Sequence, residues 1–298
     1  MFRGTATALI TPFREGAVDY DALGALLEFQ IEKGVNALVV LGTTGEAATL
    51  TAAERDQVIA FALRSVDGRI PVIIGTGTNC TAATAELSRR AQDLGADGVL
   101  VVTPFYNKPT QEGLYRHFRT VAQAVDLPVV LYNVPGRTGV NLLPETVLRL
   151  AGDVPNIKAV KEASGNQYQC DQLLRALAVV RPDFRVYSGN DDQAFHLICS
   201  GGDGVVSVLS NIVPEQTSAM VNAALQGNLE KARALHLHML PLMKDLFAES
   251  NPIPVKYAAS LLKLCRNELR LPLAPASERT CELLRADLLE LDILEDRQ

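Results

Sequence analysis

Short apolar runs recur along the chain, and stretches with helical spacing separate them. Each run is rich in valine, isoleucine and leucine at both odd and even positions, which is typical of strands buried on both faces of a parallel sheet. The eight runs begin near Thr5, Ala37, Pro71, Gly98, Pro128, Ile157, Arg185 and Gly204. Two helix boundaries between them have clear signals, a capping box at Thr51–Glu54 and a terminal glycine after Leu94. This alternation predicts an α/β protein built as a (β/α)8 TIM barrel.

A doubly wound open sheet is the main alternative fold. That fold usually has a glycine-rich phosphate turn after its first strand, whereas this chain has Ile10-Thr-Pro-Phe13 there. The last quarter of the chain contains no strand-like run. Helical patterns instead cover three segments with proline-rich breaks between them: 229–248, 254–268 and 277–295. We therefore predict a catalytic barrel over residues 1–226 and a C-terminal helical domain over residues 227–298.

The amino-acid composition and net charge mainly exclude certain classes of protein. Hydrophobic residues make up 48% of the chain and charged residues 21%, as in a packed globular protein. No apolar stretch approaches the roughly 20 residues that cross a bilayer, and the N-terminus lacks the apolar region of a signal peptide. We therefore expect no membrane association. The net charge of −6 argues against nucleic acid as a partner, because phosphate binding needs a basic face.

Cysteine and histidine spacing gives no sign of a disulfide framework or a metal site. The five cysteines are scattered and include no C-x-x-C pair, which fits reduced thiols in the cytoplasm. The four histidines form no metal motif, and His236 and His238, two apart on a predicted helix, point in different directions. We predict a cytoplasmic protein that uses no metal and no cofactor.

Lys161 is the most informative single residue, because it ends the apolar run that begins at Ile157. A lysine at the carboxyl end of a buried strand is poorly placed for packing, since burial penalises its charged form. The same penalty lowers its pKa towards the neutral amine, which can attack a ketone. The alternative is a lysine that extends to solvent at the strand end. Lys158 lies three residues earlier and therefore on the opposite strand face.

Polar residues gather at the carboxyl ends of the predicted strands, where the βα loops of a barrel converge and its active sites lie. Each motif is weak alone, because a Gly-Thr-Thr-Gly turn or a Tyr-Asn pair can simply end a strand. Their joint placement on one rim nevertheless indicates a site. The strand-end motifs are Gly42–Glu46, Thr103–Asn107, Tyr132–Arg137, Lys161, Ser188–Asp191 and Ser207.

An amine nucleophile needs partners that move protons and hold the substrate. Attack by Lys161 on a ketone gives a protonated Schiff base, and loss of a proton from the neighbouring carbon then gives an enamine. Tyr132 on an adjacent strand is well placed to move these protons, with Thr43 and Tyr106 as its candidate hydrogen-bonded neighbours. Arg137, in what we expect to be a flexible glycine-containing loop, suits two-point binding of a carboxylate. A solvated loop arginine is the alternative.

These motifs resemble those of the dihydrodipicolinate synthases, in the pyruvate-dependent class I aldolase superfamily that also contains N-acetylneuraminate lyase. The resemblance covers the whole chain. The motifs that carry it are Gly42–Glu46, Thr103–Pro109, Tyr132–Thr138, Lys161–Gly165, Ser188–Asp191 and Asn251–Lys256. The resemblance implies that Lys161 binds pyruvate covalently and that Tyr132, Thr43 and Tyr106 form a proton relay. It also implies that Tyr106 reaches into the site of a neighbouring subunit.

The same resemblance implies which residues bind the substrates. Thr44 and Arg137 would hold carboxylates, and Arg137 would take that of the incoming aldehyde. The backbone around Gly189 and Val206 would line the pocket. The family is commonly a homotetramer built as a dimer of dimers, so we expect a homo-oligomer.

Arg137 separates this interpretation from related aldolases. Enzymes acting on sugar acids need hydroxyl-binding groups at that loop, whereas a short aldehyde with its own carboxylate needs a cation. The implied reaction condenses pyruvate with L-aspartate 4-semialdehyde. The amino group of the adduct then displaces Lys161 to give 4-hydroxy-tetrahydrodipicolinate, on the route to diaminopimelate and lysine. An aldolase acting on another 2-keto acid is the alternative. A non-catalytic keto-acid sensor is disfavoured because a sensor has no use for a proton relay.

The chain departs from the family at the site where lysine inhibits some members. Those members have polar or titratable groups there to hold the ammonium and carboxylate of lysine. The corresponding positions in this chain are Ala47, Ala52, Arg55, Asn79, Ala83 and Phe105. Only Asn79 keeps the pattern. Loss of a carboxylate at position 83 and gain of a cation at position 55 disfavour a cationic amino acid, so we predict weak or no inhibition by lysine.

Overall fold

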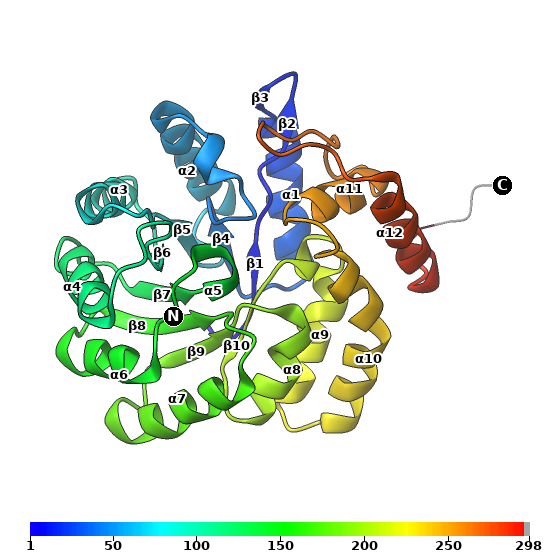
Figure 1. Ribbon diagram of the computed structural model, residues 1–298. Helices are drawn as coiled ribbons and strands as arrows, with labels where there is room; N and C mark the ends of the chain where they lie inside the picture. The colour runs from blue at the N-terminus through cyan, green and yellow to red at the C-terminus, as the bar shows by residue number, and fades with distance from the viewer. Residues whose placement is uncertain (295–298) are drawn as a thin grey trace.

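Eight parallel strands form a closed barrel in the computed structural model, which describes residues 1–294 (Figure 1). Each strand pairs with its neighbours along the chain, and the first strand closes the barrel against the last. The strands are β1 (Gly4–Ala8), β4 (Ala37–Val40), β5 (Val72–Gly75), β6 (Gly98–Val102), β7 (Val129–Asn133), β8 (Ile157–Glu162), β9 (Arg185–Ser188) and β10 (Gly204–Ser207). The predicted (β/α)8 barrel is confirmed, and every predicted strand is present.

Helices between the strands form the outer layer of the barrel (Figure 1). They are α1 (Tyr20–Glu32), α2 (Ala52–Val66), α3 (Thr81–Asp93), α4 (Gln111–Ala122), α6 (Pro144–Asp153), α7 (Gln167–Val180), α8 (Asp191–Cys199) and α9 (Pro214–Leu225). The predicted capping box is present at the start of α2, where the side chains of Thr51 and Glu54 each accept the other's backbone N–H. Helix α3 ends as predicted, because Gly95 has a φ of 95°, which favours glycine.

The strands are buried on both faces, as their composition predicts. Outward side chains such as Leu38 and Val101 pack under the helices, whereas inward side chains such as Val39 and Leu100 fill the barrel interior. Small elements complete the barrel and were not predicted from the pattern. They are β2 (Phe13–Arg14), β3 (Ala17–Val18), α5 (Pro135–Thr138) and the 3-10 turns η1 (Ala47–Thr49) and η2 (Leu209–Asn211).

The segment around Arg137 corrects one prediction. It forms the short helix α5, which begins at Pro135 and ends before Gly139, whose φ is 72°. Proline suits the first position of a helix and glycine suits a left-handed end. The expected flexible loop is therefore wrong, because a helix of four residues is too short to show a period in the sequence.

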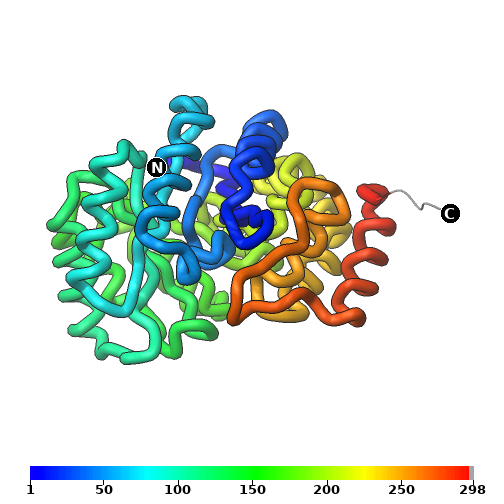
Figure 2. Tube along the Cα trace, turned by 90° about the horizontal axis from the view of Figure 1, so that it is seen from above, coloured from blue at the N-terminus to red at the C-terminus, as the bar shows by residue number. Residues whose placement is uncertain are grey.

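Three helices follow the barrel: α10 (Leu229–Asp245), α11 (Ile253–Leu261) and α12 (Glu278–Glu290). The predicted helix over 254–268 is too long, because Lys263 adopts a left-handed φ of 60° just after α11 ends. The residues between α11 and α12 instead run irregularly beside the N-terminal hairpin (Figure 2, orange beside blue). The end of the predicted segment 277–295 and residues 295–298 of the predicted domain lie outside the described residues.

The predicted division between residues 226 and 227 falls in the turn between α9 and α10. Helix α10 packs against α8 and α9, so it continues the outer layer of the barrel, and α12 packs against α10 and α11. A separate C-terminal domain stays a prediction. Among the described residues, no helix has both the length and the apolar character that a bilayer crossing requires.

Candidate active site

Lys161 lies at the carboxyl end of β8 and points into the barrel. Ala159 belongs to the interior cluster and Val160 to the outer core, so the next residue returns to the inner face. Lys161 is only 5% exposed. Burial lowers the pKa of its amine to about 8, while the charge of Asp191 opposes this shift and that of Arg137 adds to it. A reactive fraction of the amine is therefore neutral near neutral pH.

Lys158 occupies the opposite face of the same strand. Its side chain is 38% exposed, and its Nζ lies 3.9 Å from a carboxylate oxygen of Asp183 outside the barrel. The two lysines of β8 therefore lie on opposite faces of the strand, as their spacing predicts. Of the two, only Lys161 faces the barrel interior.

Strand β7 places Tyr132 directly beside Lys161. The two residues are register partners, and Lys161 Nζ lies 4.4 Å from the centre of the Tyr132 ring. Burial raises the pKa of the Tyr132 phenol to about 12, although Arg137 and a hydrogen bond with Thr43 both act against this shift. The phenol is therefore protonated near neutral pH, and Thr43 lies close enough to influence its pKa. The structure brings Lys161, Tyr132 and Thr43 together.

Tyr106 lies apart from this group within the chain. Its side chain is 89% exposed, and its φ of 72° is unusual for a residue with a bulky side chain. It lines neither of the cavities at this end of the barrel, although its neighbour Phe105 lines the outer one. A part for Tyr106 in the predicted relay therefore requires a second chain.

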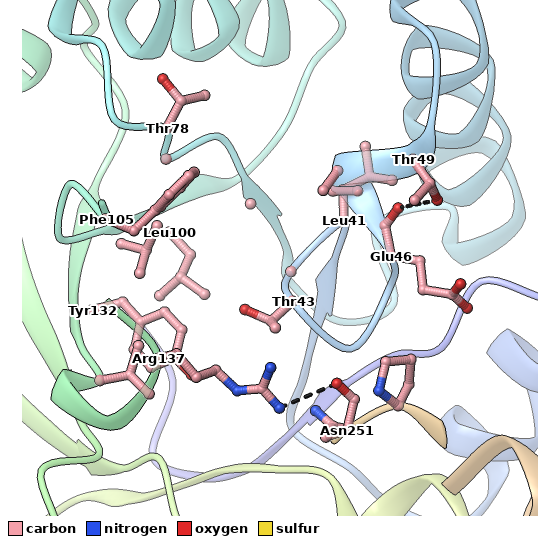
Figure 3. A pocket seen from close by; sticks show the side chains of 18 of the residues that line it. Leu41, Thr43, Glu46, Thr49, Thr78, Leu100, Phe105, Tyr132, Arg137 and Asn251 are labelled. Atoms are coloured by element: carbon pink, nitrogen blue, oxygen red, sulfur yellow. Dashed lines mark hydrogen bonds between the residues drawn. The ribbon is translucent and has the colours of Figure 1, made fainter. Parts of the chain in front are cut away.

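Two adjacent cavities open at the carboxyl end of the barrel and share Thr43, Tyr132 and Arg137 as lining residues. The inner cavity has a volume of about 50 Å³ and is lined by Lys161 and Gly189. The outer cavity has a volume of about 440 Å³ (Figure 3). The inner one suits a molecule of only a few atoms bound next to the amine, and the outer one leaves room for a second substrate.

For Val206, the lining of the pocket by the backbone around it stays a prediction. Its side chain lies inside β10, in the apolar barrel interior below the rim, and lines neither cavity. Val208, two residues further along, lines the inner cavity instead. Val208 lies just after β10 ends, at the start of the 3-10 turn η2.

The predicted carboxylate-binding residues are joined through Asn251, in the turn before α11. Arg137 Nη2 donates to the backbone oxygen of Asn251 at 3.1 Å (Figure 3). The side-chain amide of Asn251 donates to Thr44 Oγ1 at 2.8 Å. Sequence reasoning noted the Asn251–Lys256 motif but assigned Asn251 no role. The signal that could have found it is a polar residue directly before the Pro252-Ile-Pro254 break.

Asp191 is a second residue without a predicted role. It is buried at the start of α8, where its Oδ2 accepts the backbone N–H groups of Val208 and Leu209, both at 2.9 Å. Burial raises the pKa of its carboxyl, which hydrogen bonds and the charge of Lys161 partly offset. Asp191 therefore ties the ends of β9 and β10 together and supplies a negative charge that acts on Lys161.

Comparisons with known proteins agree over the whole chain. The family model described as the dihydrodipicolinate synthetase family matches residues 1–291. A 4-hydroxy-tetrahydrodipicolinate synthase of Kosmotoga olearia is 60% identical over 294 residues, which are 99% of this chain and 100% of that protein. The crystal structure of dihydrodipicolinate synthase from Thermotoga maritima has a TM-score of 0.98 at 53% identity, covering 99% of this chain and 100% of that one. A monomeric dihydrodipicolinate synthase variant has a TM-score of 0.97 at 52% identity, covering 98% of each chain.

Proposed function

The chain belongs to the dihydrodipicolinate synthetase family, and from this premise we propose how its residues carry out the reaction. The enzyme is a Schiff-base-forming synthase that makes 4-hydroxy-tetrahydrodipicolinate. Its expected substrates are pyruvate and L-aspartate 4-semialdehyde. The observation that carries the proposal is the buried amine of Lys161, whose pKa is lowered to about 8 and which lies 4.4 Å from the Tyr132 ring centre.

Lys161 is the nucleophile of the first half-reaction. Its neutral amine attacks the ketone carbon of pyruvate, a carbon–nitrogen bond forms, and the ketone oxygen leaves as water after it has taken up two protons. Tyr132 donates at this stage, because its raised pKa keeps the phenol protonated. The resulting iminium draws electrons from the adjacent carbon, so that a proton leaves the methyl group and an enamine forms. Thr43 passes protons to and from Tyr132.

The second half-reaction uses the outer cavity. The enamine carbon attacks the aldehyde carbon of the semialdehyde, and the new alkoxide takes up a proton. The amino group of the adduct then attacks the iminium carbon and releases Lys161 as the free amine, closing the ring. Arg137 binds the carboxylate of the semialdehyde, and its hydrogen bond to Asn251 holds the guanidinium at the cavity wall. Thr44 lines the inner cavity and binds the pyruvate carboxylate.

Tyr106 completes the relay from a neighbouring subunit, so the catalyst is a homo-oligomer, which we propose to be a homotetramer. The nearly full exposure of its ring and its left-handed backbone support this role, because they hold a large aromatic group away from its own chain. We also place the enzyme in the cytoplasm, where its five cysteines, all free in the structure, would stay reduced.

Weak or absent inhibition by lysine is also part of the proposal. Arg55 lines the outer cavity with Ala47 and Phe105. Its guanidinium donates to the backbone oxygens of Gly75 at 3.1 Å and Ala47 at 3.4 Å, which fixes a positive charge beside this surface. A fixed cation repels the two ammonium groups of lysine, and the alanines at positions 47 and 83 offer no side-chain acceptor for them.

Borohydride reduction in the presence of pyruvate tests the nucleophile. The enzyme should gain the mass of one reduced pyruvate, and peptide mapping should place it on Lys161. Lys161→Arg should gain no mass, and Lys158→Arg should be labelled as the unchanged enzyme is. Labelling of Lys158 in the unchanged enzyme would contradict the assignment.

A further inference from the structure

Glu46 and Lys256 form an ion pair that is separate from the reacting groups. Among the ion pairs of residues 1–294, this is the one in which both side chains are almost fully buried, with 0% of Lys256 and 1% of Glu46 exposed. Glu46 ends the loop that carries Thr43 and Thr44, and Lys256 lies in α11. The pair therefore joins the catalytic loop to the C-terminal helices.

Both charges have further partners in the C-terminal segment. Lys256 Nζ donates to the backbone oxygen of Glu268 at 2.8 Å and lies 4.0 Å from the centre of the Phe13 ring. The second carboxylate oxygen of Glu46 accepts the backbone N–H of Arg270 at 3.2 Å. Glu46 is thus bound at two points by residues that follow the barrel in the chain.

The anchored residue closes the turn that carries the two threonines. The backbone N–H of Glu46 donates to the carbonyl oxygen of Thr43 at 3.1 Å. Glu46 has a φ of 51°, a left-handed conformation that a residue with a side chain adopts only when its surroundings hold it there. Thr44 is held by the same C-terminal segment, through the side chain of Asn251.

Stability alone does not explain this pair. Removing two charges from water carries a large desolvation penalty, and well-packed apolar residues of similar size are often as stabilising or more so. What an ion pair with defined partners supplies is one fixed geometry. A small displacement of a catalytic group lowers a rate far more than it changes stability.

We propose that Glu46 and Lys256 are positioning residues that set Thr43 and Thr44 against Tyr132 and the bound pyruvate. The inference rests on the proposed roles of Thr43 and Thr44. In this arrangement the C-terminal helices take part in catalysis, because α11 supplies the fixed point to which the loop is tied. Glu46 lines the outer cavity, but its carboxylate points away from Tyr132 and Arg137 (Figure 3). Both charges therefore act through the loop.

The test replaces the pair with apolar side chains of similar length. We expect the double variant Glu46→Met/Lys256→Met to unfold in urea within the same range as the unchanged enzyme. Its exchange of pyruvate methyl protons with deuterium oxide, which reports enamine formation without the second substrate, should fall about tenfold to a hundredfold. As a matched control, Lys33→Gln/Glu215→Gln removes an exposed ion pair between the residue that follows α1 and helix α9, and it should leave exchange unchanged.

Glu46→Asp is a second variant, and it gives a result even if the fold does not accept methionine at positions 46 and 256. It keeps the charge and shortens the side chain by one methylene, so the loop should shift. Exchange of the pyruvate methyl protons should then slow in a folded protein. Full exchange in a folded Glu46→Asp or in the folded methionine pair would overturn the proposal.

Thr43→Val separates failure of this inference from failure of the proposed relay. Thr43→Val should slow exchange, and adding the methionine pair to it should slow exchange little further, because both changes act through one group. Unchanged exchange in Thr43→Val would mean that the relay itself is wrong. Fully additive losses would mean that the pair does not act through Thr43.

Discussion

Gly189 lies directly against the side chain of Lys161. A Cβ atom at position 189 would stand 3.0 Å from Cε and 3.1 Å from Cγ of the lysine, and 2.7 Å from Cβ of Ala163. The missing side chain at the end of β9 therefore leaves the space that the aliphatic part of the Lys161 side chain occupies. The motif that marked Gly189 as a lining residue reflects this close approach.

Gly189→Ala is expected to impair Schiff-base formation. The added methyl group must displace Lys161 or Ala163, and such overpacking destabilises by roughly 1–3 kcal/mol. Because Lys161 has the more flexible side chain, it should move, and borohydride trapping of pyruvate should slow at least about tenfold. Gly152→Ala is the control, since nothing lies within 4 Å of its added Cβ and it is in helix α6. Equal trapping by both variants would contradict the expectation.

The rate of trapping should depend on the titration of Lys161. Burial lowers the pKa of the amine to about 8, and only the neutral amine attacks. The initial rate should therefore rise with pH up to about 8 and then level off. Trapping measured by mass spectrometry across this range checks the expectation. A midpoint near the ordinary lysine pKa of ~10.4 would contradict it.

The same titration also predicts an effect of pH on stability. The unfolded chain binds more protons at Lys161 than the folded chain does between the folded pKa of about 8 and the ordinary lysine pKa of 10.5. The contribution of Lys161 to the free energy of unfolding therefore rises with pH between these two values. Below the folded pKa, burial of the charged amine destabilises the folded protein. Lys161→Met should abolish trapping and raise the free energy of unfolding at neutral pH by roughly 1–3 kcal/mol. Urea unfolding checks this, and a less stable Lys161→Met would contradict it.

Arg137→Ala should separate the two half-reactions. Trapping of pyruvate should persist, whereas kcat/KM for the semialdehyde should fall by roughly a hundredfold or more, because a charge-assisted carboxylate contact is lost. The midpoint of the trapping profile should also move to higher pH, since the arginine charge helps to lower the pKa of Lys161. Steady-state kinetics with each substrate varied would show the split. Equal losses in both steps would assign Arg137 to the fold or to pyruvate.

A subunit-mixing experiment tests the place of Tyr106. Tyr106→Ala and Lys161→Ala should each be nearly inactive. After the two are mixed under conditions that exchange subunits, hybrid dimers should contain one site with an intact lysine and an intact partner tyrosine, and part of the activity should return. Sedimentation analysis shows whether subunits have associated. No recovery in demonstrated hybrids would place Tyr106 outside the relay.

Inhibition by lysine should be weak or absent. Condensation should keep most of its rate when lysine is added at millimolar concentration, because Arg55 presents a fixed cation and Ala83 has no carboxylate. The rate of product formation at fixed substrate concentrations is the measurement. Half-maximal inhibition at sub-millimolar lysine would contradict the prediction.

The sequence alone determined the barrel and singled out Lys161 as the candidate nucleophile. Strands buried on both faces leave a local signature, since valine, isoleucine and leucine fill both odd and even positions, and helix caps are equally local. Lys161 stood out because it is charged and ends such a strand. The carboxyl ends of parallel strands meet on one rim, so the polar residues that follow them could be grouped without coordinates.

Only the tertiary structure decided how the C-terminal segment completes the site. The contact of Asn251 with Thr44 joins residues 207 positions apart, and the pairing of Glu46 with Lys256 joins the same loop to α11. No local pattern encodes such a contact, because each partner by itself is an ordinary polar residue near a turn. The burial that lowers the pKa of Lys161 and raises that of Tyr132 likewise arises only when the barrel closes around them.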